Sequence, residues 1–168
     1  MHALQFSNFC VEPLNSQSQC VNGKVLTSER CFCNIEGFSK KRLLTKISGL
    51  LGNLFANLDE TEVFNSMMAR EQLGSTGLGN GIAIPHCRVP QCKEVIGSLV
   101  TLSEPIDYDA IDGEPVDIIF ILIVPEEKKD EHVKVLAGLA ELFNDPDFCD
   151  TLRTCQKNKQ LFDSVISL

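Results

Sequence analysis

The nine residues VDIIFILIV, at positions 116–124, constrain the fold of this chain more than any other segment. Apart from Asp117 every side chain in the segment is apolar, and Pro125 follows directly. β-branched and aromatic residues favour a strand, and a strand that is apolar on both faces is covered on both faces. We therefore predict a central strand at 116–124, with helices packed on each side of its sheet.

Two amphipathic helices are predicted before this strand. Leucine, isoleucine and phenylalanine recur every three or four positions over 43–58, and Ser39 precedes them as a suitable N-cap. Asp59, followed three residues later by Glu62, resembles a capping box that opens a second helix, which we expect to end at Gly74.

The remaining segments complete an α/β pattern. A strand is predicted at 95–102 and turns after it, with a short edge strand over 106–108. Helices are predicted from Asp130, from Pro146 and over 159–166. The sequence therefore predicts an α/β fold with a single layered domain at 38–168, in which a mixed central β-sheet is flanked by helices on both faces. Residues 1–37 are predicted to be a loosely ordered arm with short elements.

Charge and hydropathy narrow the range of partners. The 168 residues carry a formal net charge of −8, with no block of basic residues, so neither nucleic acid nor an anionic membrane is an expected partner. No apolar run approaches the ~20 residues of a membrane-spanning helix, and MHALQFSNFC lacks the features of a secretory signal. We expect a cytoplasmic protein without membrane insertion.

The chain has eight cysteines, but their spacing does not match a zinc site. CFC at 31–33 is too tight and the interval from Cys87 to Cys92 is too wide for the C-x2-C pattern. We predict reduced thiols and no metal site.

The segment GLGNGIAIPHC, at 77–87, contains the most distinctive candidate site. Its glycines do not fit the G-x-G-x-x-G dinucleotide fingerprint, because isoleucine stands where the last glycine is required. They do not fit a P-loop either, because the required lysine is missing. What remains is a mobile glycine turn that leads into IAIPH, which presents His86. A neutral imidazole is a nucleophile that can accept a phosphoryl or acyl group. The alternative is a partly buried histidine that is hydrogen-bonded to backbone.

The same segment resembles the signature of the second structural class of phosphotransferase-system IIA proteins, the mannitol, fructose and nitrogen type. Glu71 is followed by six residues and then by LGNGIAIPHC, which satisfies every constrained position of that signature. AREQLGSTGLGNGIAIPH and IDYDAIDGEPVDIIFILIVPEE resemble the nitrogen-related members in particular, and the resemblance covers about residues 39–155. One departure is PHCR, where those members usually have PHGK, so Cys87 and Arg88 replace a glycine and a lysine.

The resemblance implies the mannitol/nitrogen-type IIA fold and specific site residues. His86 is expected to be the phosphoacceptor, through its Nε2 (tele) nitrogen, with Arg70 and His132 beside it. Arg70 can donate to the phosphoryl oxygens, and His132 lies where a helix begins. The alternatives are that Arg70 is a solvated helix residue paired with Glu71 or another carboxylate, and that His132 is a surface residue.

Substrate-binding positions are also expected in the glycine segment. These are Ser75, Thr76, Gly79 and Gly81, and Ser75 and Thr76 could instead cap the loop. No cofactor is expected.

The function that the resemblance implies is a phosphoryl relay. A small phosphocarrier protein of the HPr or NPr kind is the expected donor, and no transporter domain is present in the sequence, which favours a nitrogen-type regulatory IIA acting on target proteins. The alternatives are a sugar-specific fructose or mannitol IIA subunit that passes the group to a IIB component, and a non-catalytic protein-binding module. A metal site formed by His86, Cys87 and His132 is disfavoured because these residues make a poor tetrahedral set.

Overall fold

The computed structural model describes residues 25–127 and 129–167, and within them a single mixed β-sheet forms the framework. Its strands are β1 (Cys31–Ile35), β2 (Gly77–Gly79), β3 (Ile82–Ala83), β4 (His86–Arg88), β5 (Ile96–Ile106) and β6 (Val116–Val124). The hydrogen-bonded order is β1-β5-β6-β3-β2, and β4 pairs with β6. β6 is antiparallel to β5 and parallel to β3 and β4, whereas β1 is parallel to β5.

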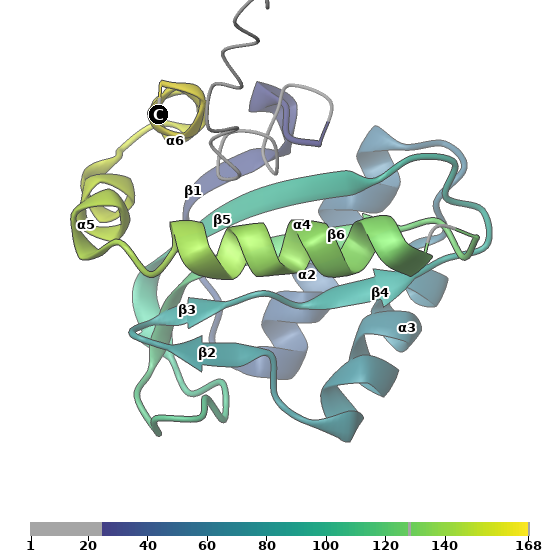
Figure 1. Cartoon of the computed structure of the whole chain (residues 1–168), viewed down its shortest axis with the longest axis horizontal. Coiled ribbons are helices and arrows are strands. Elements are labelled where there is room, and N and C mark those ends of the chain that lie inside the picture. The colour runs from purple at the N-terminus through teal and green to yellow at the C-terminus, as the bar shows by residue number, and fades with distance from the viewer. Residues whose placement is uncertain (1–24, 128, 168) are drawn as a thin grey trace, which may run out of the picture.

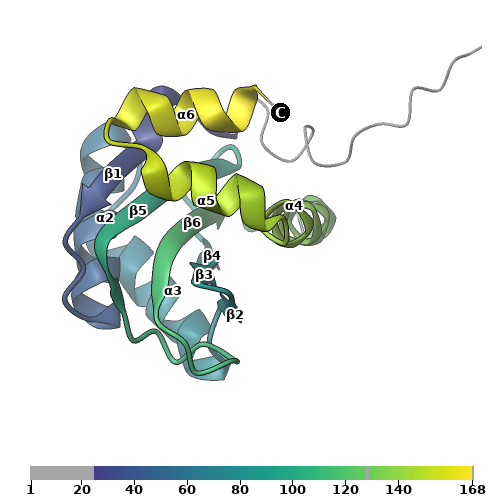
Figure 2. The same ribbon diagram turned by 90° about the vertical axis from the view of Figure 1, so that its left-hand side faces the viewer.

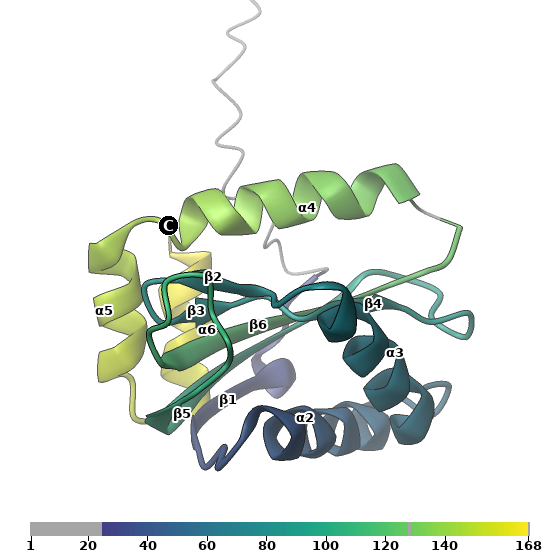
Figure 3. The ribbon, with the colours of Figure 1, turned by 90° about the horizontal axis from the view of Figure 1, so that it is seen from below.

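Helices cover both faces of this sheet. They are the 3-10 turn η1 (Ser28–Arg30) and the α-helices α2 (Lys40–Leu54), α3 (Glu60–Leu73), α4 (Lys129–Leu142), α5 (Pro146–Thr154) and α6 (Asn158–Ile166). α4 crosses one face of the sheet, and α2 and α3 lie on the other (Figures 1 and 3). α6 packs against β1 and η1, and α5 lies beside it (Figure 2). The predicted α/β architecture is confirmed, and no described helix has the length and apolarity needed to span a bilayer.

The central strand β6 explains this layering. Phe120 and Leu122 contact the core formed with α4, α5 and α6, whereas Ile119 and Ile121 contact the core formed with α2 and α3. All four side chains are at most 1% exposed. Because neighbouring residues of a strand point to opposite faces, an uninterrupted apolar run fills both cores.

The predicted helix starts are confirmed. Ser39 accepts a hydrogen bond from the N–H of Arg42, and Asp59 accepts one from the N–H of Glu62. α5 begins at Pro146, whose missing N–H costs nothing at the first helical position. These caps satisfy backbone donors that have no partner within the helix.

Two boundary predictions are wrong. β5 continues through Pro105 to Ile106, with a register irregularity after Thr101, so residues 106–108 do not form a separate edge strand. The domain also begins before residue 38, because β1 pairs with β5, and Val25 and Leu26 are buried in the core. Residues 1–24 of the predicted arm lie outside the described residues.

Candidate active site

His86 is the first residue of β4, at the edge of the sheet. It lies opposite Leu122 in the parallel pairing with β6, and the N–H of Leu122 donates to the carbonyl of Pro85 at 3.0 Å. Pro85 has no N–H to donate to a ladder, which is consistent with the break between β3 and β4 at this point. The strand pairing therefore fixes the backbone of His86 while its side chain is only half-buried.

The glycines before His86 form a tight hairpin between β2 and β3. Asn80 and Gly81 have φ of 56° and 82°, and Asn-Gly is a preferred pair for a two-residue turn of this kind. A Cβ atom at Gly81 would lie 2.7 Å from Nη2 of Arg153 and 2.8 Å from Oδ1 of Asp117. These contacts give Gly81 a structural reason to lack a side chain, since larger residues would displace the ion pair that packs on the hairpin.

Arg70 reaches His86 from the last turn of α3. Its Nη1 donates to the carbonyl of Gly74 at 2.9 Å, and its Nε donates to Nε2 of His86 at 3.2 Å. The structure therefore brings Arg70 and His86 together, as the family resemblance implies. The alternative suggested by the sequence was an ion pair between Arg70 and Glu71. In the structure Glu71 pairs with Lys40 instead.

The contacts of His86 fix the tautomer of its ring. Nδ1 lies 2.9 Å from the carbonyl oxygen of Ile84, which can only accept, so Nδ1 carries the proton. Nε2 faces an N–H of Arg70, which can only donate, so Nε2 has the lone pair. The nitrogen that faces Arg70 is thus the unprotonated one.

His132 lies beside His86 in a pocket that both residues line. It belongs to the first turn of α4, and its ring centroid is 5.4 Å from that of His86. The pocket has a volume of about 460 Å³. Its lining residues are Ser66, Ala69, Arg70, His86, Cys87, Arg88 and His132. The three residues expected to act together, from α3, β4 and α4, meet in this pocket.

Arg88 also lines the pocket, although the sequence did not indicate a role for it. Its Nη2 lies 3.4 Å from Nδ1 of His132. The strand alternation was an available signal, because residues two apart on β4 point to the same side, so Arg88 accompanies His86. Ser66 and Ala69 were also missed, although both lie within one turn of Arg70 on α3.

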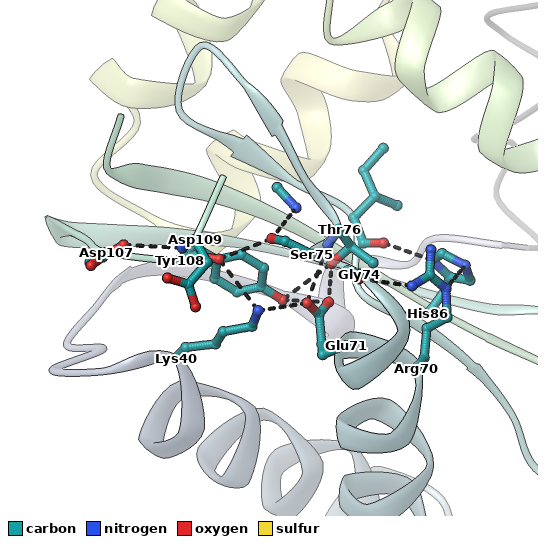
Figure 4. A network of polar contacts seen from close by, with 12 residues as sticks. Lys40, Arg70, Glu71, Gly74, Ser75, Thr76, His86, Asp107, Tyr108 and Asp109 are labelled. Atoms are coloured by element: carbon teal, nitrogen blue, oxygen red, sulfur yellow. Dashed lines mark hydrogen bonds and ion pairs between the residues drawn. The ribbon is translucent and has the colours of Figure 1, made fainter. Parts of the chain in front are cut away.

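Glu71 points away from the pocket into a buried polar network (Figure 4). Its side chain is 3% exposed and pairs with Nζ of Lys40 at 2.7 Å. The hydroxyl of Tyr108 donates to the carboxylate at 3.1 Å, and Thr76 donates to it through its hydroxyl and, at 3.2 Å, through its N–H. Burial and the nearby charge of Glu71 raise the pKa of Tyr108, so its phenol stays protonated and donates.

The four predicted substrate-binding residues do not line the pocket. The hydroxyl of Ser75 donates to the carbonyl of Tyr108 at 3.0 Å, and the side chain of Thr76 is committed to Glu71. Gly79 and Gly81 belong to the hairpin, where a Cβ atom would meet Asp112 or Arg153. The geometry gives these residues a scaffold role, and contact with a substrate stays a prediction.

Comparison with known proteins identifies the family of this fold and pocket. A sequence model of the phosphoenolpyruvate-dependent sugar phosphotransferase system, EIIA 2, matches residues 24–167. The chain belongs to this family. The match confirms the resemblance inferred from the glycine segment, and it begins just before the first described residue.

Similar IIA proteins include several named nitrogen regulatory protein. The one from Pseudomonas aeruginosa is 41% identical over 145 residues, which is 86% of this chain and 94% of the relative. The one from Escherichia coli strain K12 is 37% identical over 150 residues, which is 89% of each chain. The crystal structure of IIA-Ntr from Neisseria meningitidis has a TM-score of 0.80 and 38% identity, covering 85% of this chain and 97% of that one.

The structure of IIA mannitol from Escherichia coli shares the fold at greater sequence distance. Its TM-score is 0.70 at 17% identity, and the match covers 83% of this chain and 98% of that one. This likeness supports the IIA fold and says nothing more specific about function.

Cys87, where this IIA chain departs from the usual glycine, is a structural thiol. It is 6% exposed and packs in the core that α2 and α3 share with the sheet. Burial raises its pKa to about 12, so the reactive thiolate is not populated near neutral pH. Within the described part of the chain, no three histidine, cysteine or carboxylate side chains lie close enough to hold a metal ion.

We expect His86 to stay neutral to a lower pH than an ordinary histidine. Burial lowers its pKa below 6.5, the hydrogen bond to the Ile84 carbonyl opposes this, and the charge of Arg70 lowers it further. An NMR titration of the ring should therefore have its midpoint below 6.5, and Arg70→Ala should raise that midpoint. Since the unfolded ring takes up a proton at a higher pH than the folded one, this residue's contribution to stability falls as the pH drops below 6.5. A midpoint at or above 6.5 in the wild-type protein would contradict this account.

Proposed function

We propose that this IIA protein accepts a phosphoryl group on Nε2 of His86 from the phosphohistidine of a small phosphocarrier protein, and that it acts as a nitrogen-type regulatory IIA. The observation that carries the proposal is the state of the His86 ring, in which Nδ1 donates to Ile84 and Nε2 presents its lone pair beside Arg70. The nitrogen regulatory relatives, two of which are 41% and 37% identical to this chain, support the regulatory assignment.

The transfer step follows from this geometry. The lone pair of Nε2 attacks phosphorus, a P–Nε2 bond forms, and the P–N bond to the donor histidine breaks, so that the donor imidazole keeps the bonding electron pair. The proton on Nδ1 stays in its hydrogen bond to Ile84 throughout. It thereby stabilises the positive charge that the phosphorylated ring acquires, and keeps that ring a good leaving group for the next transfer.

Arg70 has two successive roles in this proposal. At rest one of its N–H groups occupies the lone pair of Nε2, so the guanidinium must shift before phosphorus approaches. The anchor to the Gly74 carbonyl keeps it within the pocket during the shift. Its N–H donors then bind the equatorial phosphoryl oxygens, where negative charge accumulates in the transition state. His132, whose ring lies beside that of His86 and which belongs to the first turn of α4, is a second donor to the same oxygens.

The direct test is a reconstituted relay. The protein is incubated with phosphoenolpyruvate, the first enzyme of the relay and a nitrogen-type phosphocarrier, and intact mass is then measured. We expect a gain of one phosphoryl group that is labile in acid and stable in base. If the carrier is labelled and the mass of this protein stays unchanged, the relay function is contradicted. A non-catalytic protein-binding module would then be the better hypothesis.

A sugar-specific role is the second candidate. The family is described as a sugar phosphotransferase system, and one structural neighbour, at 16% identity, is the complex of IIA mannitol with phosphorylated IIB mannitol of Escherichia coli. Labelling rates with the two kinds of carrier separate the candidates. Faster labelling by a nitrogen-type carrier supports the regulatory role, whereas equal or reversed rates favour the sugar-specific subunit.

Arg70→Ala is expected to slow phosphoryl transfer to His86 by about 10²–10³, the usual cost of losing one preorganised donor to a transition-state oxyanion. The rate is measured by rapid quench at saturating carrier. Arg42→Ala is a matched control, because it removes the same charge from an exposed position on α2. Transfer by Arg70→Ala at the rate of the Arg42→Ala control would show that the guanidinium of Arg70 is not used.

A further inference from the structure

Arg88 extends into the phosphoryl pocket from the same strand as His86. It lies two residues after His86 on β4, and both side chains line the pocket. Its Nη2 reaches Nδ1 of His132 at 3.4 Å, so the guanidinium bridges from the edge strand to the first turn of α4. Arg88 therefore contacts His132 and lines the same pocket as His86.

The contact with Arg88 indicates which ring nitrogen of His132 carries the proton. A guanidinium has donors and no acceptor, so Nδ1 of His132 accepts and its neutral ring carries the proton on Nε2. The two arginines thus contact different ring nitrogens of the two histidines. Arg70 faces Nε2 of His86, whereas Arg88 faces Nδ1 of His132.

The charge of Arg88 is not neutralised by a neighbour in the described structure. None of the described side chains forms an ion pair with it, and the residues lining the pocket include no carboxylate. Two guanidiniums and two imidazoles around one pocket of about 460 Å³ form a site suited to a dianion.

We propose that Arg88 is a second phosphoryl-binding residue beside Arg70, which donates to the oxygens of the group on His86 and positions His132 through the Nδ1 contact. This inference rests on the phosphoryl-transfer function proposed above. A guanidinium has five N–H donors, so holding Nδ1 of His132 leaves others for phosphoryl oxygen.

A small chemical donor separates this role from docking of the carrier. Phosphoramidate carries a P–N bond whose protonated nitrogen leaves as ammonia when Nε2 of His86 takes the phosphoryl group. Labelling rates are compared with phosphoramidate and with the phosphocarrier, for wild type, Arg88→Ala, Arg88→Lys and the Arg42→Ala control. We expect Arg88→Ala to be about 10- to 100-fold slower with both donors, below the loss at Arg70 because Arg88 is more exposed. Arg88→Lys should recover part of the rate, and Arg42→Ala should match wild type.

The outcomes distinguish the two proposals. Wild-type rates for Arg88→Ala with both donors would overturn the role of Arg88, and a loss confined to the carrier reaction would assign Arg88 to docking instead. If neither donor labels the wild-type protein, the relay function itself fails.

The effect on His132 is measured without any donor. ¹⁵N NMR of the unphosphorylated protein should show the Nε2–H tautomer of His132 in wild type and a mixture of tautomers in Arg88→Ala. An unchanged tautomer would overturn the positioning role.

Discussion

His86→Ala is expected to abolish phosphoryl labelling while leaving the fold intact. The phosphoryl group needs a nitrogen lone pair, and in the pocket Nε2 of His86 is the nitrogen that two donor–acceptor contacts hold in nucleophilic form. His132 presents a different arrangement, since its Nδ1 is engaged by Arg88. Loss of the imidazole therefore removes the acceptor, which no rearrangement of its neighbours replaces.

The stability cost of this change should be small. The His86 side chain is half-buried and its hydrogen bond to Ile84 contributes about 1 kcal/mol, so we expect the free energy of unfolding to fall by about that amount. Labelling is followed by intact mass and unfolding by urea titration of the same samples. His132→Ala is the comparison variant, because it removes the other imidazole of the pocket and should be labelled slowly. Stoichiometric labelling of His86→Ala would place the phosphoryl group on another residue.

The sequence predicted those parts of the fold that local patterns determine. The apolar run at 116–124 coincides with β6, and the cap residues Ser39 and Asp59 are where α2 and α3 begin. β1 was missed because CFCNI is short and half-buried, and its pairing partner β5 lies more than sixty residues later. Such a strand is stabilised by a long-range contact that no local pattern records.

The site was predictable only where the family resemblance specified it. His86, Arg70 and His132 came from the resemblance, and the structure brings them to one pocket. Arg88 was seen only as a departure from the usual lysine, because its contact with His132 joins residues 44 apart. Ser75 and Thr76 were expected near the phosphoryl group because the sequence does not reveal that Tyr108 and Glu71 engage their hydroxyls.

Glu71→Gln is expected to lower the free energy of unfolding by about 3 kcal/mol. Removing one partner of a buried ion pair leaves the other charge poorly solvated, which typically costs 3–5 kcal/mol. The lower end applies here because Lys40 is 18% exposed and can turn partly toward water, whereas Glu71 is 3% exposed. The amide also loses an acceptor for Thr76, and Tyr108 keeps a weaker one.

A double-variant comparison isolates the ion pair from the rest of the network. Lys40→Met combined with Glu71→Gln leaves no unpaired charge, so its free energy of unfolding should exceed that of Glu71→Gln alone. Glu104→Gln removes the same charge from an exposed position on β5 and should change stability by less than about 0.5 kcal/mol. A Glu71→Gln protein as stable as this control would mean that the network contributes nothing to stability.

The Glu71→Gln substitution should also affect the pocket that Arg70 and His86 line, because Arg70 and Glu71 share α3. Arg70 and Glu71 are adjacent in the last turn of this helix, and Glu71 ties that turn to Lys40 on α2 and to Thr76 before β2. When Glu71→Gln removes these interactions, the last turn of α3 should unfold locally more often. Amide hydrogen exchange over 70–76 should therefore accelerate more than exchange in β6. Arg70 then spends less time beside Nε2 of His86, so transfer should slow in Glu71→Gln even in conditions where the protein is fully folded. Unchanged exchange over 70–76 would mean that the anchor at Gly74 alone holds Arg70 in place.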